Sequence, residues 1–190
     1  MLQSEDKPRG KETMMIKRLL TTLTLTVTVT LAGNFTLKSS DLMGQLTKVQ
    51  EFDGFGCTGK NTSPQLQWEG APEGTKSFAV TMYDPDAPTG SGWWHWIVVN
   101  IPAKVHQIDT GASSKEMPKG VIEVQNDYGN PGFGGACPPK GDKPHRYIFT
   151  VYALDVEKLP VKESTNAPIV GFQINAHTLG KASLISYYGR

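Results

Sequence analysis

One stretch, residues 83–100, limits the possible folds of this chain more than any other. It begins Tyr-Asp-Pro-Asp-Ala-Pro, passes through a Thr-Gly-Ser-Gly turn and ends in Trp-Trp-His-Trp-Ile-Val-Val-Asn. Proline fixes φ and lacks a backbone N–H, so residues 84–88 cannot lie in a regular helix or a central strand. We therefore expect a rigid corner that leads into an apolar strand. Taken alone, this pattern fits a plain hairpin turn as well as one wall of a polar pocket.

Segments on both sides of the corner have the patterns of β-strands. Residues 77–83 and 146–154 show the two-residue period, whereas residues 94–101 are apolar on both faces, as in a strand covered by two layers. Helical spacing occurs over residues 168–179, where Pro168 suits a first turn. We also predict short strands after Phe35 and at 46–52, 66–68, 121–125 and 182–188, with 105–120 as a surface loop. Together these elements predict a mainly β fold, an antiparallel β-sandwich with a short C-terminal helix.

The N-terminal 32 residues have a different character from the rest of the chain. A basic segment around Lys17 and Arg18 precedes an uncharged run of leucine, valine and threonine that reaches Ala32. This is the pattern of a secretion signal, and the run is too short for a membrane span. We expect residues 1–32 to be an N-terminal extension with a signal peptide, and residues 33–190 to form a single domain. An amphipathic strand is the alternative interpretation of the run.

Charge and cysteine content narrow the classes of function. The formal net charge of +1 gives no general electrostatic argument for binding nucleic acid. The sequence has two cysteines, Cys57 and Cys137, and both lie in glycine-rich segments. An even number of cysteines in an exported chain favours a disulfide between them, with two free thiols as the alternative.

A second segment, residues 134–147, carries the remaining candidate chemistry. Its glycines and prolines form a loop that can bring backbone N–H groups close to a ligand. The loop leads into a strand on which His145 and Tyr147, two residues apart, share one face. If this strand lies near the acidic corner, these side chains converge with Asp84 and His95. Such a site would suit a phosphate or carboxylate, with Asp84 orienting a histidine.

These blocks resemble the signature of a known family. The Asp-Pro-Asp-Ala-Pro corner, the Trp-His-Trp-Ile-Val-Val-Asn strand, the Asn-Thr-Ser-Pro segment at 61–64 and the Pro-Pro-Lys-Gly loop before His145-Arg146-Tyr147 are similar to those of phosphatidylethanolamine-binding proteins, also called the Raf kinase inhibitor-like family. The resemblance runs from about Phe35 to the C-terminus. The bacterial YbhB/YbcL branch is the most similar, and its exported members also match the two cysteines and the signal.

The resemblance implies a binding or inhibitory module rather than an enzyme. It implies a small pocket for phosphate or phosphoethanolamine-like anions, no cofactor, a periplasmic or secreted location, and regulation of a partner such as a kinase or protease. It also implies a cis peptide before Pro88. Edge strands of a sandwich can pair between copies, which allows a homodimer. The ligand-binding residues carried over are Asp84, Asp86, His95, Gly135, Cys137, Pro139, His145 and Tyr147.

Two alternative functions use the same side chains. The carboxylates of Asp84 and Asp86 and the imidazoles of His95 and His145 are acceptable zinc ligands, although their spacing is not a zinc signature. A hydrolase would need an activated nucleophile. Ser91 lies between two glycines, but it lacks the strand–elbow–helix setting of a Gly-x-Ser-x-Gly nucleophile.

Overall fold

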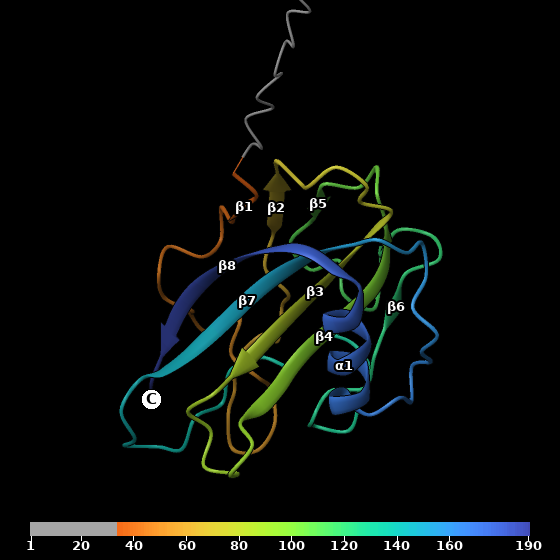
Figure 1. Cartoon of the computed structure of the whole chain (residues 1–190). Coiled ribbons are helices and arrows are strands. Elements are labelled where there is room, and N and C mark those ends of the chain that lie inside the picture. Colours follow the sequence, from red (N-terminus) through yellow and green to blue (C-terminus); the bar gives the residue numbers. More distant parts are fainter. Residues whose placement is uncertain (1–33) are drawn as a thin grey trace, which may run out of the picture. The chain divides into compact units, whose positions relative to one another are not determined.

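The computed structural model of the chain describes residues 34–190 (Figure 1), so the predicted signal and its cleavage after Ala32 lie outside the described residues. The described part contains eight strands and one helix. This helix is not long and apolar enough to cross a membrane. In chain order the elements are β1 (Thr36–Lys38), β2 (Leu66–Glu69), β3 (Ser77–Asp84), β4 (Trp93–Pro102), β5 (Gln107–Ile108), β6 (Ile122–Glu123), β7 (His145–Leu154), α1 (Ala167–His177) and β8 (Thr178–Tyr188).

The strands form two antiparallel sheets. The smaller sheet has the order β1-β2-β5, and the larger has the order β6-β4-β3-β7-β8. All strand pairs in both sheets are antiparallel. In the larger sheet β3 lies between β4 and β7, so the acidic end of β3 is flanked by the strands that carry the two candidate histidines. The predicted mainly β architecture with one short helix is confirmed.

Apolar side chains cover the larger sheet on both faces. On one face, Phe78 and Phe149 belong to a buried cluster with Trp68 of the smaller sheet. On the other face, Ile97 packs in a second cluster with Val170 of α1, and Figure 1 shows this helix lying across β4. Burial on both faces explains why β3 and β4 are almost continuously apolar, as predicted for residues 94–101.

Several predicted elements differ in extent from those observed, including the closing strand predicted at 182–188, which begins at Thr178 as β8, and the strand predicted at 121–125, which is limited to Ile122–Glu123. Residues 46–52 do not form a strand, because the Gln50 side chain accepts hydrogen bonds from the backbone and hydroxyl of Thr47 and stabilises a turn instead. The loop predicted at 105–120 contains β5, which pairs with β2. The helix ends at His177 and not at residue 179, because the chain enters β8 directly at Thr178.

The acidic corner is closed without a cis peptide. The residues that the structure describes contain no cis bond, so the expectation of one before Pro88 is wrong. Asp84 Oδ1 accepts hydrogen bonds from the N–H groups of Asp86 at 2.8 Å and Ala87 at 3.1 Å. The N–H of Thr89 donates to the carbonyl of Ala87 at 2.8 Å. These bonds close the turn with trans peptides throughout.

Candidate functional site

A pocket of about 340 Å³ opens where the β3–β4 corner meets the loop before β7. Its lining combines charged, aromatic and proline side chains that are distant in the sequence. The lining residues are Phe55, Asp84, Ala87, Pro88, Thr89, Trp93, His95, Tyr128, Cys137, Pro138, Pro139, His145 and Arg190. The structure therefore brings five of the predicted site residues to one cavity, namely Asp84, His95, Cys137, Pro139 and His145.

A buried carboxylate–imidazole pair lies at the centre of the site. Asp84 ends β3 and His145 begins β7, its neighbour in the sheet. Asp84 Oδ2 lies 2.8 Å from His145 Nδ1, and both side chains are almost fully buried. Because Oδ1 accepts two backbone N–H groups, the carboxylate is fixed in position. Asp84 thus orients a histidine, as the sequence predicted.

The second nitrogen of His145 also faces a carboxylate. Its Nε2 lies 3.3 Å from Oδ2 of Asp142, which is on the loop before β7. Burial by itself lowers the pKa of His145, but the hydrogen bonds to Asp84 and Asp142 outweigh it and raise this pKa above 6.5. The protonated ring then donates to two carboxylates at once.

His95 presents the opposite chemistry. Its Nδ1 lies 2.8 Å from the carbonyl oxygen of Gly134 and 3.1 Å from that of Gly135. Carbonyls only accept, so Nδ1 carries the hydrogen. Burial lowers the pKa of His95 to about 4, so the ring is neutral near pH 7 and Nε2 is an acceptor. Nε2 is buried and has no hydrogen-bond partner within residues 34–190. His95 therefore offers an acceptor, and not a donor, at Nε2.

Tyr147 lies behind the pocket and does not line it. Its ring packs edge-on against the ring of His95, with centroids 5.2 Å apart, and its side chain is fully buried. Burial and the nearby charge of Asp84 raise the pKa of Tyr147 well above its usual range. Tyr147 and His145 do share a face of β7, but Tyr147 lies about 7 Å further along the strand, inside the core. It supports His95 from behind.

Asp86 is used to attach β7 to the corner. Its two carboxylate oxygens accept from Nε and Nη2 of Arg146, each at 2.8 Å, and one also accepts from the Arg146 backbone N–H at 2.9 Å. The Arg146 guanidinium holds the pKa of Asp86 well below its usual range. Asp86 does not line the pocket, and its bonds to Arg146 fix the backbone of β7 next to His145.

The backbone N–H groups of the glycine-rich loop are engaged within the protein. The N–H of Gly135 donates to Asn61 Oδ1 at 2.7 Å, and the N–H of Gly134 donates to the carbonyl of His95 at 2.8 Å. A Cβ at Gly135 would lie 2.2 Å from the backbone oxygen of Gln50, so only glycine fits there. These N–H groups, which the sequence suggested as ligand donors, instead hold the loop against the rest of the domain.

An aromatic wall completes one side of the pocket. Tyr128 stacks on Phe52 with ring centroids 4.0 Å apart, and it contacts the rings of Trp93 and His95 edge-on. Its hydroxyl donates to the carbonyl of Gly135 at 3.0 Å. Tyr128 could not be identified from the sequence, because it lies in an irregular segment where periodicity is absent.

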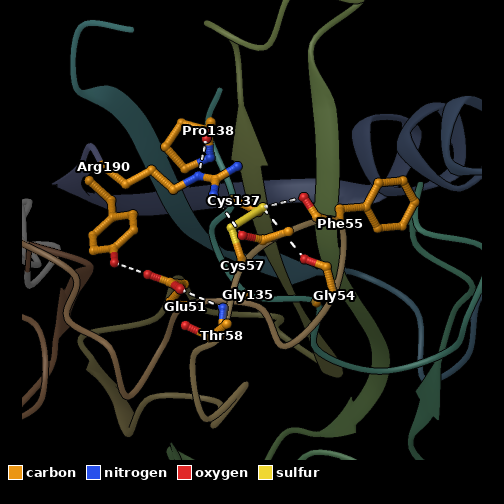
Figure 2. Close-up of a disulfide and its surroundings, with 12 residues drawn as sticks. Glu51, Gly54, Phe55, Cys57, Thr58, Gly135, Cys137, Pro138 and Arg190 are labelled. Atoms are coloured by element: carbon orange, nitrogen blue, oxygen red, sulfur yellow. Dashed lines mark hydrogen bonds between the residues drawn. A yellow bond between two sulfur atoms is a disulfide. The ribbon is translucent and has the colours of Figure 1, made fainter. Parts of the chain in front are cut away.

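The rim carries a disulfide and an arginine (Figure 2). Cys57 and Cys137 are bonded, with their Cα atoms 5.9 Å apart. The guanidinium of Arg190 lies beside this bond and donates to the carbonyls of Pro138 at 2.6 Å and Gly56 at 2.8 Å. Arg190 was not among the predicted site residues, since a single arginine near the end of a strand has no distinguishing pattern.

Two antiparallel sheets, an Asp-Pro-Asp-Ala-Pro corner and a pocket built on a buried aspartate–histidine pair define the phosphatidylethanolamine-binding class of domain. The family model described as phosphatidylethanolamine-binding protein matches residues 39–189, and the chain belongs to this family. UPF0098 protein YbcL of Escherichia coli (strain K12) is 56% identical over 147 residues, which cover 76% of this chain and 80% of that protein. YbhB of the same organism is 51% identical over 139 residues, covering 72% and 87%. The resemblance to the YbhB/YbcL branch is thereby confirmed.

Solved structures agree with this assignment. The crystal structure of E. coli YbcL, described as a new member of the mammalian PEBP family, superposes with a TM-score of 0.80 at 52% identity. The match covers 82% of this chain and 98% of that one. A homologue from Chlamydia trachomatis, CT736, described as a putative member of the family, gives a TM-score of 0.69 at 28% identity, covering 82% and 97%.

Proposed function

We propose that this protein is a binding module that recognises a small phosphate-like anion in the pocket beside His145. The observation that carries the proposal is the charge of the lining. His145 has a raised pKa and Arg190 is permanently charged, whereas Asp84 is the one acid among the described lining residues. Asp84 and, outside the lining, Asp142 offset the charge of His145, so Arg190 carries the lining charge that no carboxylate of residues 34–190 pairs with.

The size of the pocket limits the ligand. A volume of about 340 Å³ is at the lower end of the range for small-molecule sites. It suits a phosphate or a phosphoethanolamine headgroup better than a whole lipid. The family description, which refers to phosphatidylethanolamine, supports the same chemistry. A phosphorylated or acidic side chain of a partner protein, such as a kinase or protease, would present an equivalent group, and the predicted signal would place this binding in the periplasm or outside a bacterial cell.

The metal alternative is less well supported by the side-chain geometry. Asp86 faces Arg146, and the Nδ1 of His95 faces two carbonyls, so the four proposed ligands do not point at a common centre. Within residues 34–190, no group of three or more His, Cys, Asp or Glu side chains is arranged to hold a metal ion. The hydrolase alternative would need an activated nucleophile in the pocket. The hydroxyl of Thr89, which lines the pocket, is hydrogen-bonded to the carbonyl of Gly92 and is not directed at an imidazole.

Calorimetry and NMR titration with inorganic phosphate and with phosphoethanolamine test the proposal. We expect both to bind the purified protein at pH 6.5, and His145→Gln to weaken binding by about tenfold, because loss of the imidazolium leaves the charges of Asp84 and Asp142 unbalanced beside the anion. His177→Gln is the matched control, since His177 forms a comparable but exposed pair with Asp155 outside the pocket. Absence of binding by the wild-type protein, or equal binding by His145→Gln, would refute the proposal.

A further inference from the structure

We propose that Arg190 is the side chain that contacts the bound anion, and that the Cys57–Cys137 disulfide sets its position. Anion affinity then depends on the oxidation state of the two cysteines. This inference rests on the proposed function, because it assigns the donor within the same pocket. It is carried by the distribution of hydrogen bonds around the lining residues, which leaves few donors for a ligand.

Most polar groups of the lining are already engaged as donors or act as acceptors. Both nitrogens of His145 face carboxylates. The Nδ1 of His95 donates to carbonyls, so the remaining nitrogen of that ring is an acceptor. The hydroxyls of Tyr128 and Thr89 donate to backbone carbonyls. None of these groups offers a free N–H or O–H to an anion.

Arg190 differs from these groups. A guanidinium has five N–H donors, and only Nε and Nη1 of Arg190 form hydrogen bonds within residues 34–190. The salt bridges of that part of the chain do not include Arg190. The indole N–H of Trp93 also has no partner there, but it is buried and neutral. Arg190 is therefore the group that combines a full charge with unused donors.

The disulfide controls where this guanidinium lies. One acceptor of Arg190 is the carbonyl of Pro138, the residue after Cys137, and the other is the carbonyl of Gly56, the residue before Cys57. The two carbonyls thus belong to residues that are adjacent in sequence to the two bonded cysteines. The bond fixes the spacing of the two loops, and with it the pair of acceptors that holds the guanidinium at the pocket.

The domain does not depend on the disulfide alone to join these two loops. The N–H of Phe52 donates to the carbonyl of Ala136 at 3.0 Å, and the N–H of Ala136 donates to the carbonyl of Gln50 at 3.1 Å. These bonds persist when a dithiol reductant transfers two electrons and two protons to the cystine and is itself oxidised to a disulfide. Reduction then releases the tip around Gly56, and Arg190 loses one of its two fixed acceptors.

Titration with inorganic phosphate tests both parts of this proposal. We expect Arg190→Gln to weaken phosphate binding by about tenfold, and Arg190→Lys to weaken it less, because lysine keeps the charge but not the planar fork. The Cys57→Ser/Cys137→Ser variant should lose severalfold in affinity. Adding Arg190→Gln to that variant should cost less than it does in the oxidised protein, since the two changes act on one interaction.

The outcomes separate this inference from the proposed function. If the oxidised wild-type protein binds phosphate and Arg190→Gln binds it equally well, the inference fails and the proposed function stands. Additive effects of the arginine and cysteine changes would overturn the link to the disulfide. If the wild-type protein does not bind phosphate, both proposals fail. The NMR signal of the Arg190 Nε–H gives an independent readout without ligand, and it should move on reduction of the native protein.

Discussion

Replacing Asp84 by asparagine tests how the buried pair stabilises the domain. Asparagine has the shape of aspartate and keeps an oxygen for the N–H groups of Asp86 and Ala87, which bond to Asp84 Oδ1. It removes the negative charge opposite His145 Nδ1 and places an N–H₂ group there. The asparagine amide and the Nδ1–H of His145 would then both be donors, unless the ring releases its Nδ1 proton. Because the bonds that close the corner are kept, the variant tests the charge of the pair separately from the closure of the corner.

The expected loss can be estimated from the burial of the pair. Removing one partner of a buried ion pair costs about 3–5 kcal/mol, and Asp84 and His145 are 2% and 1% exposed. We expect Asp84→Asn to lose about 3 kcal/mol, at the lower end, because neutral His145 can accept from the new amide. Asp84→Ala should lose about 2 kcal/mol more, since two backbone N–H groups then lack an acceptor.

Urea unfolding at several pH values measures both effects. The pKa of His145 is raised in the folded protein, so its pairing stabilises the fold fully below about pH 6.5 and is lost as pH rises through the folded pKa. The difference in unfolding free energy between wild type and Asp84→Asn should therefore be largest near pH 6 and shrink at higher pH. Asp155→Asn, at an exposed pair with His177, should cost less than about 1 kcal/mol.

Two results would contradict this reasoning. A loss below about 1 kcal/mol for Asp84→Asn at pH 6 would show that the pair contributes no more than a surface ion pair. A loss of about 3 kcal/mol that does not change with pH would show that packing, and not the charge of His145, is responsible. The slope of unfolding free energy against urea concentration should be the same for the wild-type protein and the variants. The comparison then reports a difference in stability and not a change in the unfolded state.

Two further predictions concern the same domain. The pKa of His95 is about 4 in the folded protein against an ordinary value of 6.5, so the unfolded chain binds the proton first as the pH falls. The free energy of unfolding should therefore fall by about 3 kcal/mol between pH 6.5 and 4. His95→Gln should remove most of this pH dependence, as measured by urea unfolding. The disulfide joins residues 80 positions apart, and its loss in Cys57→Ser/Cys137→Ser should cost at most about 4.5 kcal/mol in the chain-entropy model, measured by unfolding with and without a dithiol reductant. These predictions are wrong if the unfolding free energy of the wild-type protein does not change over this pH range, or if the oxidised wild-type protein and the serine variant are equally stable.

Much of the fold could be predicted because its main strands have clear local patterns. Residues 146–154 alternate in the sequence and form the long strand β7, and the corner at 84–88 follows from the geometry of proline. The turn around Thr47 could not be predicted in this way, since its apolar residues also match a strand and the deciding contact is a side-chain hydrogen bond.

The site was less predictable than the fold, because its details depend on contacts between distant segments. Asp84 and His145 are 61 residues apart, and only strand pairing brings them together. Asp86 is two residues from Asp84 and carries the same functional group, yet it pairs with exposed Arg146. Tyr128 and Arg190 reach the pocket from irregular or terminal segments, where no periodicity exists to identify them.

The buried carboxylate explains how a pocket for an anion can contain an acid. Burial by itself lowers the pKa of His145, and Asp84 is the nearer of the two carboxylates that outweigh this effect. Asp84 favours the protonated ring, and its own charge is satisfied by two backbone N–H groups and the imidazole. The acid therefore does not simply repel a ligand, because its charge is offset by the imidazolium with which it pairs. An anion then meets a site in which His145 is neutralised locally and Arg190 supplies the attraction, which is why the two side chains should contribute differently to affinity.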